Sequence, residues 1–352
     1  MFSLIILDCL MKLRKERTIS AIYHLLTGKR SSQTLQDAHM YQLTGYFGLI
    51  KSLQRKEFNK CMERMVKNGL ISIDNDGVGF PTKKGEDYLI TNNQSNILEE
   101  FKGMEYEKFA ELFSLRLLLL IQTITNKKAE STGFIALTDD KQAQLWVKQL
   151  YRKYRHELDQ LVTGIYHDLH AFLSKLTDQQ ASLFVERLTG YEKIGLSKLQ
   201  LANKYKMNIL DIEVWLVYIY HKILTESIHE KDKYPYLTLA LEGIMDQTFV
   251  TNSATVTYNM LQNGFTIDAI ARSRRLKLNT IEDHIVEIAY MDPYFTIGNF
   301  VGEAEQKEML KAIELLQTNR LKLIKTKLND KFSYFQIRLV LAKHRLEDKG
   351  SM

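Results

Sequence analysis

A chain of 352 residues is long enough for two or three domains, each with a hydrophobic core of its own. Its hydrophobic fraction of 45% and charged fraction of 26% are those of a folded protein and exclude a disordered or collagen-like chain. Few prolines and glycines, with many Leu, Ile, Lys and Glu, predict a mainly α-helical fold. The formal net charge of +6 is small, so the placement of the charges is more informative than their sum.

No stretch of the sequence has the pattern of a signal peptide or a transmembrane helix. The apolar residues 2–7 are followed, not preceded, by positive charges. The most apolar run, 112–124, is interrupted by an Arg and a Gln and is too short to cross a bilayer. Cys9 and Cys61 lie far apart in the sequence, which argues against a redox or metal-binding pair. We therefore expect a cytoplasmic protein with reduced cysteines and no membrane partner.

Residues 1–92 have the pattern of a winged-helix-like domain. Helical periodicity covers residues 4–13, 19–26, 35–43, 47–53 and 56–68. The last of these helices ends at Gly69 and is followed by the only convincing strand signal in the sequence, at 70–73 and 78–80. The residues between these strands, 74–77, read Asp-Asn-Asp-Gly and predict a tight hairpin turn. A closing helix is expected from Thr82 onward.

Two further domains are expected after a polar linker near residues 92–95. A helical middle domain is predicted at 93–248, and it contains a first pair of short helices at 196–222. A C-terminal domain is predicted at 249–352, and it contains a second such pair. The remaining helices are expected within 97–176 and at 177–188, 236–248, 252–261, 303–328 and 334–346.

The segment 263–291 has the pattern of a helix-turn-helix. Thr266 is expected to cap a first short helix whose inward residues include Ile270. Asn279 is expected to cap the second helix, and Glu282 three residues later would complete a capping box. Two short helices joined by a tight turn are typical of nucleic-acid binders, and the alternative is two helices of an ordinary α-helical core.

The same pattern occurs a second time, 69 residues earlier. Residues 196–219 align with residues 265–288 without a gap, and the inward positions match while the outward positions do not. Ser197 falls on Thr266, and Glu213 falls on Glu282. The sequence therefore predicts two copies of one packing unit.

The sequence contains no motif that predicts catalysis. Residues 27–30 resemble a phosphate-binding loop but lack its first Gly and its final Ser or Thr, and no dinucleotide fingerprint or nucleophile elbow occurs. The best metal candidate is a group of polar residues at 156–170, for which exposed helix polarity is the favoured interpretation. We therefore expect a protein that is not an enzyme, with no cofactor, no metal and no small-molecule substrate. The members of that group are His156, His167, Asp168 and His170.

The positive charge is concentrated in the segments 51–67 and 319–349, and further cations crowd the turn of the second helix pair. Such clusters are often solvated helix faces, but here they flank a winged helix and a helix-turn-helix, which often bind phosphates. At the turn, the four cations have no predicted packing role. The candidate nucleic-acid-binding residues are Arg55, Lys56, Lys60, Arg64, Lys67, Lys83, Arg272, Arg274, Arg275, Lys277, Arg320 and Lys325.

Three stretches of the sequence resemble the YpbB family, bacterial proteins encoded next to a RecQ-type DNA helicase. They are LTGKRSSQTLQDAHMY (26–41), the helix-turn-helix segment, and FSYFQIRLVLA (332–342). The region of about 253–342 is similar to the helix-turn-helix module at the C-terminus of some RecQ helicases, and the N-terminal part is similar in outline to their winged helix. The resemblance implies a non-catalytic accessory or partner of a RecQ-type helicase that binds duplex or branched DNA in DNA recombination or repair.

Two features depart from DNA-binding relatives of this kind. The wing tip at 74–77 is acidic and carries no aromatic residue, which argues against strand separation by the wing. The second helix of the later pair carries Glu282, Asp283 and Glu287, expected to be exposed, and His284 is its single candidate donor. Two alternatives therefore stay open: a protein-interaction adaptor without DNA contact, and a helix-turn-helix transcription regulator.

Overall fold

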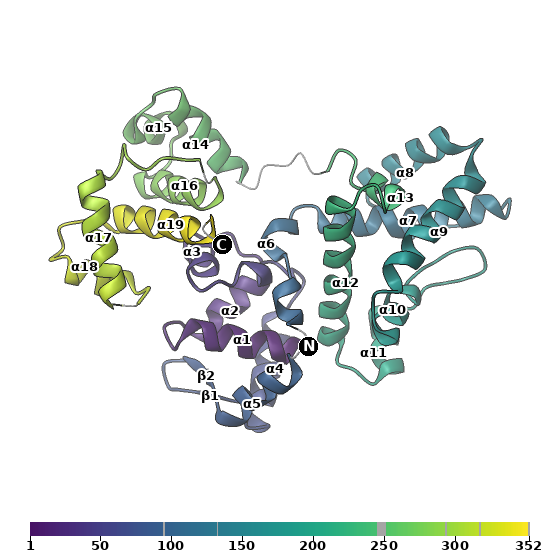
Figure 1. The fold of residues 1–352 in the computed structure, drawn as a ribbon, viewed down its shortest axis with the longest axis horizontal. Helices are drawn as coiled ribbons and strands as arrows, with labels where there is room; N and C mark the ends of the chain where they lie inside the picture. Colours follow the sequence, from purple (N-terminus) through teal and green to yellow (C-terminus); the bar gives the residue numbers. More distant parts are fainter. Residues whose placement is uncertain (94–95, 132, 245–250, 293, 317, 351–352) are drawn as a thin grey trace. The chain divides into compact units, whose positions relative to one another are not determined.

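The computed structural model describes residues 1–352 apart from 94–95, 132, 245–250, 293, 317 and 351–352 (Figure 1). It confirms a mainly α-helical fold with one short antiparallel hairpin in the described residues. The contacts between residues divide the chain into two compact units, and each unit consists of two separate segments of the sequence. Unit 1 comprises Met1–Ile5 and Asn93–Gln247, and unit 2 comprises Ile6–Asn92 and Thr248–Met352. Unit 2 therefore combines segments of two predicted domains, 1–92 and 249–352.

The helices of unit 1 follow one another between residues 97 and 239. They are η2 (Ile97–Glu100), α6 (Gly103–Tyr106), α7 (Ala110–Lys128), α8 (Lys141–Tyr154), α9 (Leu158–Leu173), α10 (Asp178–Val185), α11 (Lys198–Tyr205), α12 (Ile209–His229) and α13 (Pro235–Leu239). The apolar run predicted as a core helix lies in α7, where residues 117–121 are buried. The predicted helix 236–248 is wrong in length, because α13 ends at Leu239 and Gly243 adopts a left-handed φ of 69°. Its last four residues lie outside the described residues.

Unit 2 begins with helices and the hairpin from the N-terminal part of the chain. These elements are α1 (Phe2–Leu13, whose first residues belong to unit 1), α2 (Ile19–Leu26), α3 (Ser32–Met40), η1 (Thr44–Tyr46), α4 (Arg55–Lys67), β1 (Ile71–Ile73), β2 (Gly79–Pro81) and α5 (Lys83–Asn92). The rest of unit 2 comes from the C-terminal part. It contains α14 (Asn252–Gln262), α15 (Ile267–Arg274), α16 (Leu278–Met291), α17 (Glu303–Leu316), α18 (Leu321–Lys327) and α19 (Tyr334–Gly350).

The N-terminal part of unit 2 is the predicted winged helix. Helix α4 buries Phe58, Cys61, Met62 and Met65 along one face and ends before Gly69, whose φ is 69°. The two strands pair in antiparallel register, and an isolated bridge between residues 18 and 78 adds the segment before α2 to this small sheet. At the acidic wing tip, the carboxylate of residue 74 accepts hydrogen bonds from the backbone N–H groups of residues 76 and 78, so it supports the turn itself.

Two helices predicted in unit 2 do not form as predicted, and in both places the chain contacts residues distant in sequence. The predicted helix 47–53 is absent, because Gly48 N–H and Ile50 N–H donate to the last carbonyls of α2, Leu25 and Leu26, at 2.8 and 2.9 Å. This segment therefore satisfies the open end of another helix instead of its own backbone. The predicted helix 303–328 is divided into α17 and α18.

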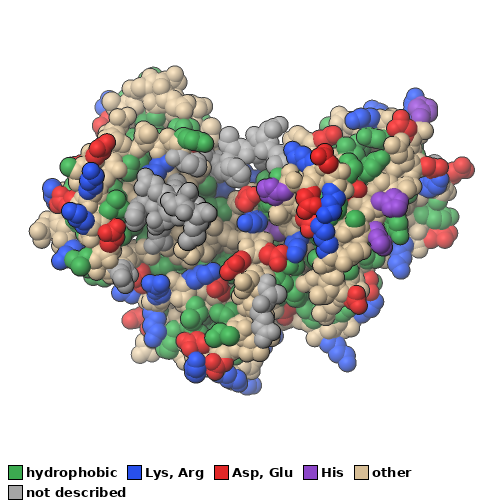
Figure 2. Space-filling model, viewed as in Figure 1, with side chains coloured by type: hydrophobic (Ala, Val, Ile, Leu, Met, Phe, Trp, Pro, Cys, Tyr) green, Lys and Arg blue, Asp and Glu red, His purple; other side chains and the backbone are tan. Residues whose placement is uncertain are grey.

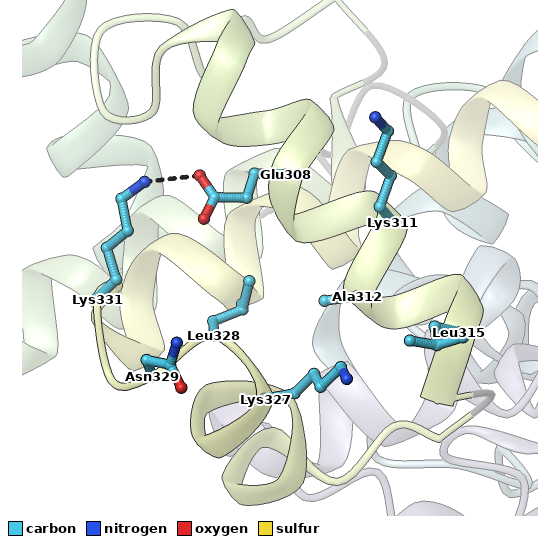
Figure 3. A pocket seen from close by; sticks show the side chains of 8 residues that line it. All are labelled: Glu308, Lys311, Ala312, Leu315, Lys327, Leu328, Asn329 and Lys331. Carbon is cyan, nitrogen blue, oxygen red and sulfur yellow. Dashed lines mark hydrogen bonds and ion pairs between the residues drawn. The ribbon is translucent and has the colours of Figure 1, made fainter.

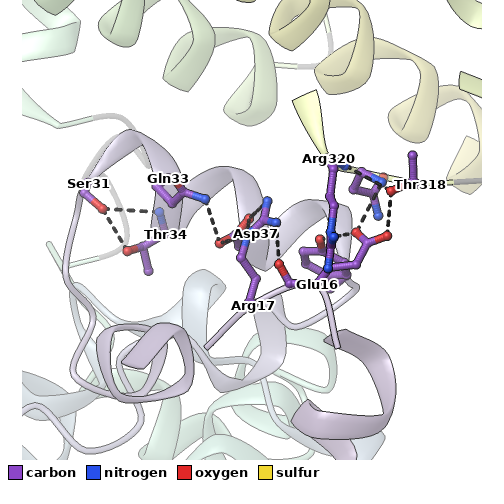
Figure 4. Close-up of polar contacts among 10 residues, drawn as sticks. Glu16, Arg17, Ser31, Gln33, Thr34, Asp37, Thr318 and Arg320 are labelled. Carbon is purple, nitrogen blue, oxygen red and sulfur yellow. Dashed lines mark hydrogen bonds and ion pairs between the residues drawn. The ribbon is translucent and has the colours of Figure 1, made fainter. Parts of the chain in front are cut away.

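The break between α17 and α18 is tied to the N-terminal part of unit 2 through Glu16 (Figure 4). Its carboxylate accepts a hydrogen bond from Thr318 Oγ1 at 2.6 Å and another from Tyr41 Oη at 2.6 Å. The guanidinium of Arg320 donates to the Lys15 carbonyl at 3.0 Å. Burial alone would raise the pKa of Glu16, but the hydrogen bonds from Thr318, Tyr41 and the Asn319 backbone N–H lower it.

Helix α3 joins the two parts of unit 2, because it packs against both α16 and α19. The His39 ring stacks on Tyr290 with ring centroids 4.5 Å apart. Arg338, on α19, forms an ion pair with Asp283 at 2.7 Å and also donates to the hydroxyl of Ser32. The winged helix and the C-terminal helices are therefore held as one body.

A buried histidine in unit 1 makes the stability of that unit depend on pH. The Nδ1 atom of His221, on α12, accepts a hydrogen bond from the Lys102 backbone N–H at 3.0 Å, which requires the neutral ring. Burial lowers the pKa of His221 to about 3. In the unfolded chain the same ring has a pKa of about 6.5.

We therefore expect the stability that the neutral His221 ring contributes to be complete above about pH 6.5 and to be lost progressively as the pH falls toward 3. In His221→Asn the amide oxygen can still accept the Lys102 N–H, but it does not titrate. The melting temperature of this variant should fall less than that of the unchanged protein between pH 6.5 and 4.5. If the melting temperatures of the two proteins fall equally with pH, His221 does not set the pH dependence of stability.

Candidate nucleic-acid interface

The second helix pair has helix-turn-helix geometry. The Thr266 side chain caps α15 by accepting a hydrogen bond from the Ala269 N–H. Arg275 ends that helix in the left-handed conformation, with a φ of 52°, and the Leu276 N–H donates to the Ala271 carbonyl at 3.0 Å. Helix α16 begins two residues later, so the turn is as short as the sequence predicted.

The first pair repeats this geometry at the same offset of 69 residues. Helices α11 and α15 both have eight residues, and α12 and α16 begin at matching positions. Ser197 caps α11, and Lys206 ends it with a φ of 53°. The Met207 N–H donates to the Ala202 carbonyl at 2.9 Å, as its counterpart does in the second pair. This agreement supports the predicted internal repeat.

The predicted capping box of α16 is wrong. The left-handed residue at 275 turns the chain directly into α16, so the helix begins at Leu278 and Asn279 already lies inside its first turn. Lys277 occupies the N-cap position and its side chain makes no capping hydrogen bond. In the first pair the matching residue, Asn208, does cap its helix by accepting the Leu210 N–H at 2.9 Å.

Helix α16 is packed inside unit 2 over most of its length, contacting α3, α14, α15 and α19. The acidic residues predicted to be exposed on it are half-buried or buried. Glu287 accepts hydrogen bonds from the Thr251 N–H at 2.7 Å and from the Thr251 hydroxyl at 3.1 Å, and Arg30 lies 3.5 Å away. The ring of His284 is engaged with the hydroxyl of Thr257 at 2.9 Å. The middle and the end of α16 therefore do not present donors or acceptors to base edges, whereas Leu278 and Asn279 in its first turn are exposed.

Three of the four cations at the turn remain available to a ligand. Arg272, Arg275 and Lys277 are exposed, and none of them is paired with another described residue. Arg274 differs from the prediction, because its guanidinium donates to Ser253 at the carbonyl (2.7 Å) and at the hydroxyl (2.8 Å), and also to Thr257 Oγ1. Arg274 therefore joins α15 to α14, and the sequence pattern had no signal for this role.

A second group of available cations forms a stripe on α4. Lys56, Lys60, Arg64 and Lys67 are spaced three or four residues apart, so they lie along one side of the helix, away from its buried face. All four are exposed, and none forms an ion pair with another described side chain. We call these four residues the α4 stripe. Arg55 is engaged differently, since it donates to the Ser20 hydroxyl at 2.8 Å.

The other predicted binding residues have partners within unit 2. Lys83 pairs with Asp87 at 3.1 Å on an exposed side of α5. Lys325 lies 3.5 Å from Asp330, and its ammonium lies 4.8 Å from the centre of the Tyr334 ring. Arg320 has the backbone contact to residue 15 described above. These cations are less available to phosphates than the α4 stripe.

One pocket that sequence reasoning missed lies between α17 and the end of α18 (Figure 3). Its volume is about 350 Å³, and its apolar lining includes Leu328. Lys311, Lys327 and Lys331 also line it, and Lys331 is paired with Glu308 at 2.6 Å. A single straight helix over 303–328 would have kept these side chains apart, so the pocket depends on the break between the two helices.

Basic and acidic side chains are mixed on one face of unit 2 (Figure 2). On the face of unit 2 that Figure 2 shows, Lys and Arg side chains are interspersed with Asp and Glu. Attraction of an anionic polymer therefore depends on short-range contacts with particular clusters.

Comparison with known proteins agrees with this architecture. The model of a helix-turn-helix domain family matches residues 253–341, which contain α15 and α16. The protein YpbB of Bacillus subtilis (strain 168) is 32% identical over 358 aligned positions that cover 97% of each chain. The chain belongs to the YpbB family. No solved structure matches this YpbB family member.

The described residues of this YpbB family member contain neither a metal-binding cluster nor a single membrane-spanning helix. No group of three or more His, Cys, Asp or Glu side chains among them could hold a metal ion. Asp168, from the predicted metal candidate, instead accepts hydrogen bonds from the backbone N–H groups of Tyr236 and Leu237 at the start of α13. No single described helix is long and apolar enough to span a membrane, although the bent pair Ile97–Tyr106 and Ala110–Lys128 meets those criteria jointly.

Arg274 and Arg272 should respond differently to truncation. We expect Arg274→Ser to lower the free energy of unfolding by about 1–3 kcal/mol, because several hydrogen bonds between α14 and α15 are lost. Arg272→Ser, at an exposed position on the same helix, should change it by less than about 0.5 kcal/mol. Urea unfolding curves of both variants test this, and equal stabilities would remove the structural role of Arg274.

The side chain of Lys277 should lower the stability of the fold while adding a positive charge to the turn. A cation at the start of a helix is unfavourable because the N-terminus is the positive end of the helix dipole, and Lys277 supplies no capping acceptor. We expect Lys277→Asn, which copies Asn208 of the first pair, to raise the free energy of unfolding by about 0.5–2 kcal/mol and to weaken binding to duplex DNA. Melting curves and binding isotherms on the same samples measure both effects. Unchanged DNA affinity would exclude Lys277 from the interface.

Proposed function

We propose that this chain is a non-catalytic DNA-binding accessory of a RecQ-type helicase that acts in recombination or repair in the cytoplasm and contacts DNA mainly through phosphates. The observation that carries the proposal is the α4 stripe. It lies on the helix that a winged helix normally presents to DNA, and its opposite face is buried in the core. Lysine and arginine side chains in such a stripe favour phosphate contacts, which carry little sequence information.

The burial of α16 supports the sequence-independent part of this proposal. A sequence-specific regulator needs side chains that reach base edges in the major groove. Here Asp283, Glu287 and His284 of α16 are engaged with other residues of unit 2. Contacts at the turn, through residues such as Arg275, remain compatible with binding to the phosphate backbone. The engagement of these α16 side chains within unit 2 argues against the transcription-regulator alternative.

The helicase partner and the absence of catalysis rest on sequence features. The sequence contains no complete phosphate-binding loop, which favours an accessory that relies on the motor of another protein. The RecQ-type partner follows from the family resemblance alone. Capture of such a helicase from native lysate by the tagged full chain would support it, and a lysate partner set without any helicase would count against it.

An adaptor that binds protein rather than DNA is the second candidate. It is favoured by two large apolar side chains at the start of the first helix pair, Ile194 and Leu199, which are 86% and 59% exposed. Exposed apolar residues of this kind often mark contacts with other proteins. Binding of the purified chain to random duplex DNA separates the two candidates, because the adaptor would not bind it.

We expect the affinity for duplex DNA to fall steeply with salt and to vary little with sequence. Four to six phosphate contacts would give a slope of roughly −4 to −5 in a plot of log affinity against log salt concentration. Replacing Lys60, Arg64 and Lys67 together by Ser should reduce the magnitude of that slope by about 2–3 and weaken binding on the order of 10- to 100-fold at physiological salt. Fluorescence anisotropy with two unrelated duplexes measures both quantities.

A matched variant controls for the loss of three positive charges. Lys128, Lys204 and Lys233 are paired with Asp159, Glu186 and Glu230 on the surface of unit 1. Their joint replacement by Ser, the charge-control variant, should leave the affinity for DNA nearly unchanged. If the charge-control variant weakens binding as much as the α4 variant does, the α4 stripe is not the binding site.

A further inference from the structure

Unit 2 carries two groups of available cations on different elements. One is the α4 stripe of the winged helix, and the other is the turn of the second helix pair, with Arg272, Arg275 and Lys277. The residues of both groups are exposed and unpaired with any other described side chain. Because the first comes from the N-terminal part of the chain and the second from the C-terminal part, the fold of unit 2 alone fixes their relative placement.

The two groups lie on elements at opposite ends of unit 2 (Figure 1). In Figure 1, α4 lies at one end of unit 2 and α15 lies at the opposite end, with α3, α16 and α19 between them. A compact body of roughly 190 residues has a radius of gyration of about 16 Å, so its diameter is about 40 Å. This exceeds the Debye length of about 8 Å at physiological salt several-fold, so charges at the two ends are screened from each other.

The connection between the two ends is firm. Glu16 holds the segment between α17 and α18 through residues 318 and 319. Arg338 connects α19 to α16 and to α3, and the stacked pair His39 and Tyr290 lies in the same interface. A ligand at one end is therefore held at a fixed position relative to a ligand at the other.

We propose that unit 2 bridges two segments of duplex DNA, one bound along the α4 stripe and the other at the turn around Arg275. This rests on the proposed DNA-binding function. Bending a single duplex around the unit is the competing arrangement. The duplex would have to curve around a body about 40 Å across, along a path of roughly 20–30 base pairs. Smooth bends of 40–90° over that length already cost on the order of 1–6 kcal/mol. Two separate segments, or two arms of a junction, avoid that cost.

The test is capture of one duplex by another. A duplex of about 25 base pairs, too short to wrap around the unit, is fixed to beads, and the full chain and a second, labelled duplex are added. We expect the labelled duplex to be retained on the beads only when the protein is present. Retention of protein on the beads, measured on the same samples, reports binding to a single duplex.

Two variants separate the two ends. The α4 variant is Lys60→Ser, Arg64→Ser and Lys67→Ser, and the turn variant is Arg272→Ser, Arg275→Gly and Lys277→Ser. The turn variant spares Arg274 and places Gly at the left-handed position, so it should fold. Each variant should still bind the immobilised duplex but should capture at least tenfold less labelled duplex than the charge-control variant.

A mixture of the two variants distinguishes bridging within one molecule from bridging by a pair of molecules. If one copy holds both duplexes, an equal mixture should capture no more than either variant alone. Recovery of capture in the mixture, or full capture by the turn variant, would overturn the inference. Binding of the unchanged chain to the immobilised duplex without capture of the second would overturn it too and leave the proposed function standing. Absence of any DNA binding would refute the proposed function itself.

Discussion

The buried carboxylate of Glu287 is the interaction on which the arrangement of unit 2 most depends. It accepts two hydrogen bonds from Thr251, at the start of α14, and lies near Arg30, from the N-terminal part of the chain. Because a buried carboxylate is costly without partners, this contact favours one placement of α16. That placement packs α16 against α3 and buries most of the helix after its first turn. The helix that reads bases in other helix-turn-helix proteins here connects the N-terminal and C-terminal parts of unit 2.

Unit 2 is consequently a discontinuous body, interrupted by the chain of unit 1 between residues 92 and 248. Its joining contacts link residues about 300 positions apart, such as Glu16 with Thr318 and Ser32 with Arg338. Contacts of this kind form late, because the closure of a long loop must precede them. Two stretches that carry the family resemblance, 26–41 and 332–342, contain all of α3 and the first half of α19, which pack together. This interface gives both stretches a structural role within unit 2.

What the sequence predicted well was local. The bounds of α2, the hairpin and the first cap of each helix pair follow from short patterns, and the structure confirms them. The errors all involve a partner distant in sequence or an unusual backbone angle. Residues 47–53 have a helical pattern but donate to the end of α2, and Arg274 resembles its basic neighbours but is held by Ser253. For the site, the sequence indicated the exposed cations of α4, and their role as DNA ligands stays a prediction.

At the turns of the two helix pairs, the fold explains the positive charge of some residues but not of others. Lys206 and Arg275 are both cations at a helix C-terminus, where the dipole favours them by about 0.3–1 kcal/mol, partly offsetting their left-handed backbone conformation. Their charge therefore has a structural explanation. The charge of Lys277 has no structural explanation. Lys277 lies at the N-cap position of α16, where Asn208 of the first pair accepts a capping hydrogen bond, and its side chain makes no such bond. A cation that disfavours its own helix, on an exposed turn beside Arg272 and Arg275, is consistent with the phosphate contacts proposed for this turn. Of the two helix pairs, the second is therefore the better candidate for contact with phosphates.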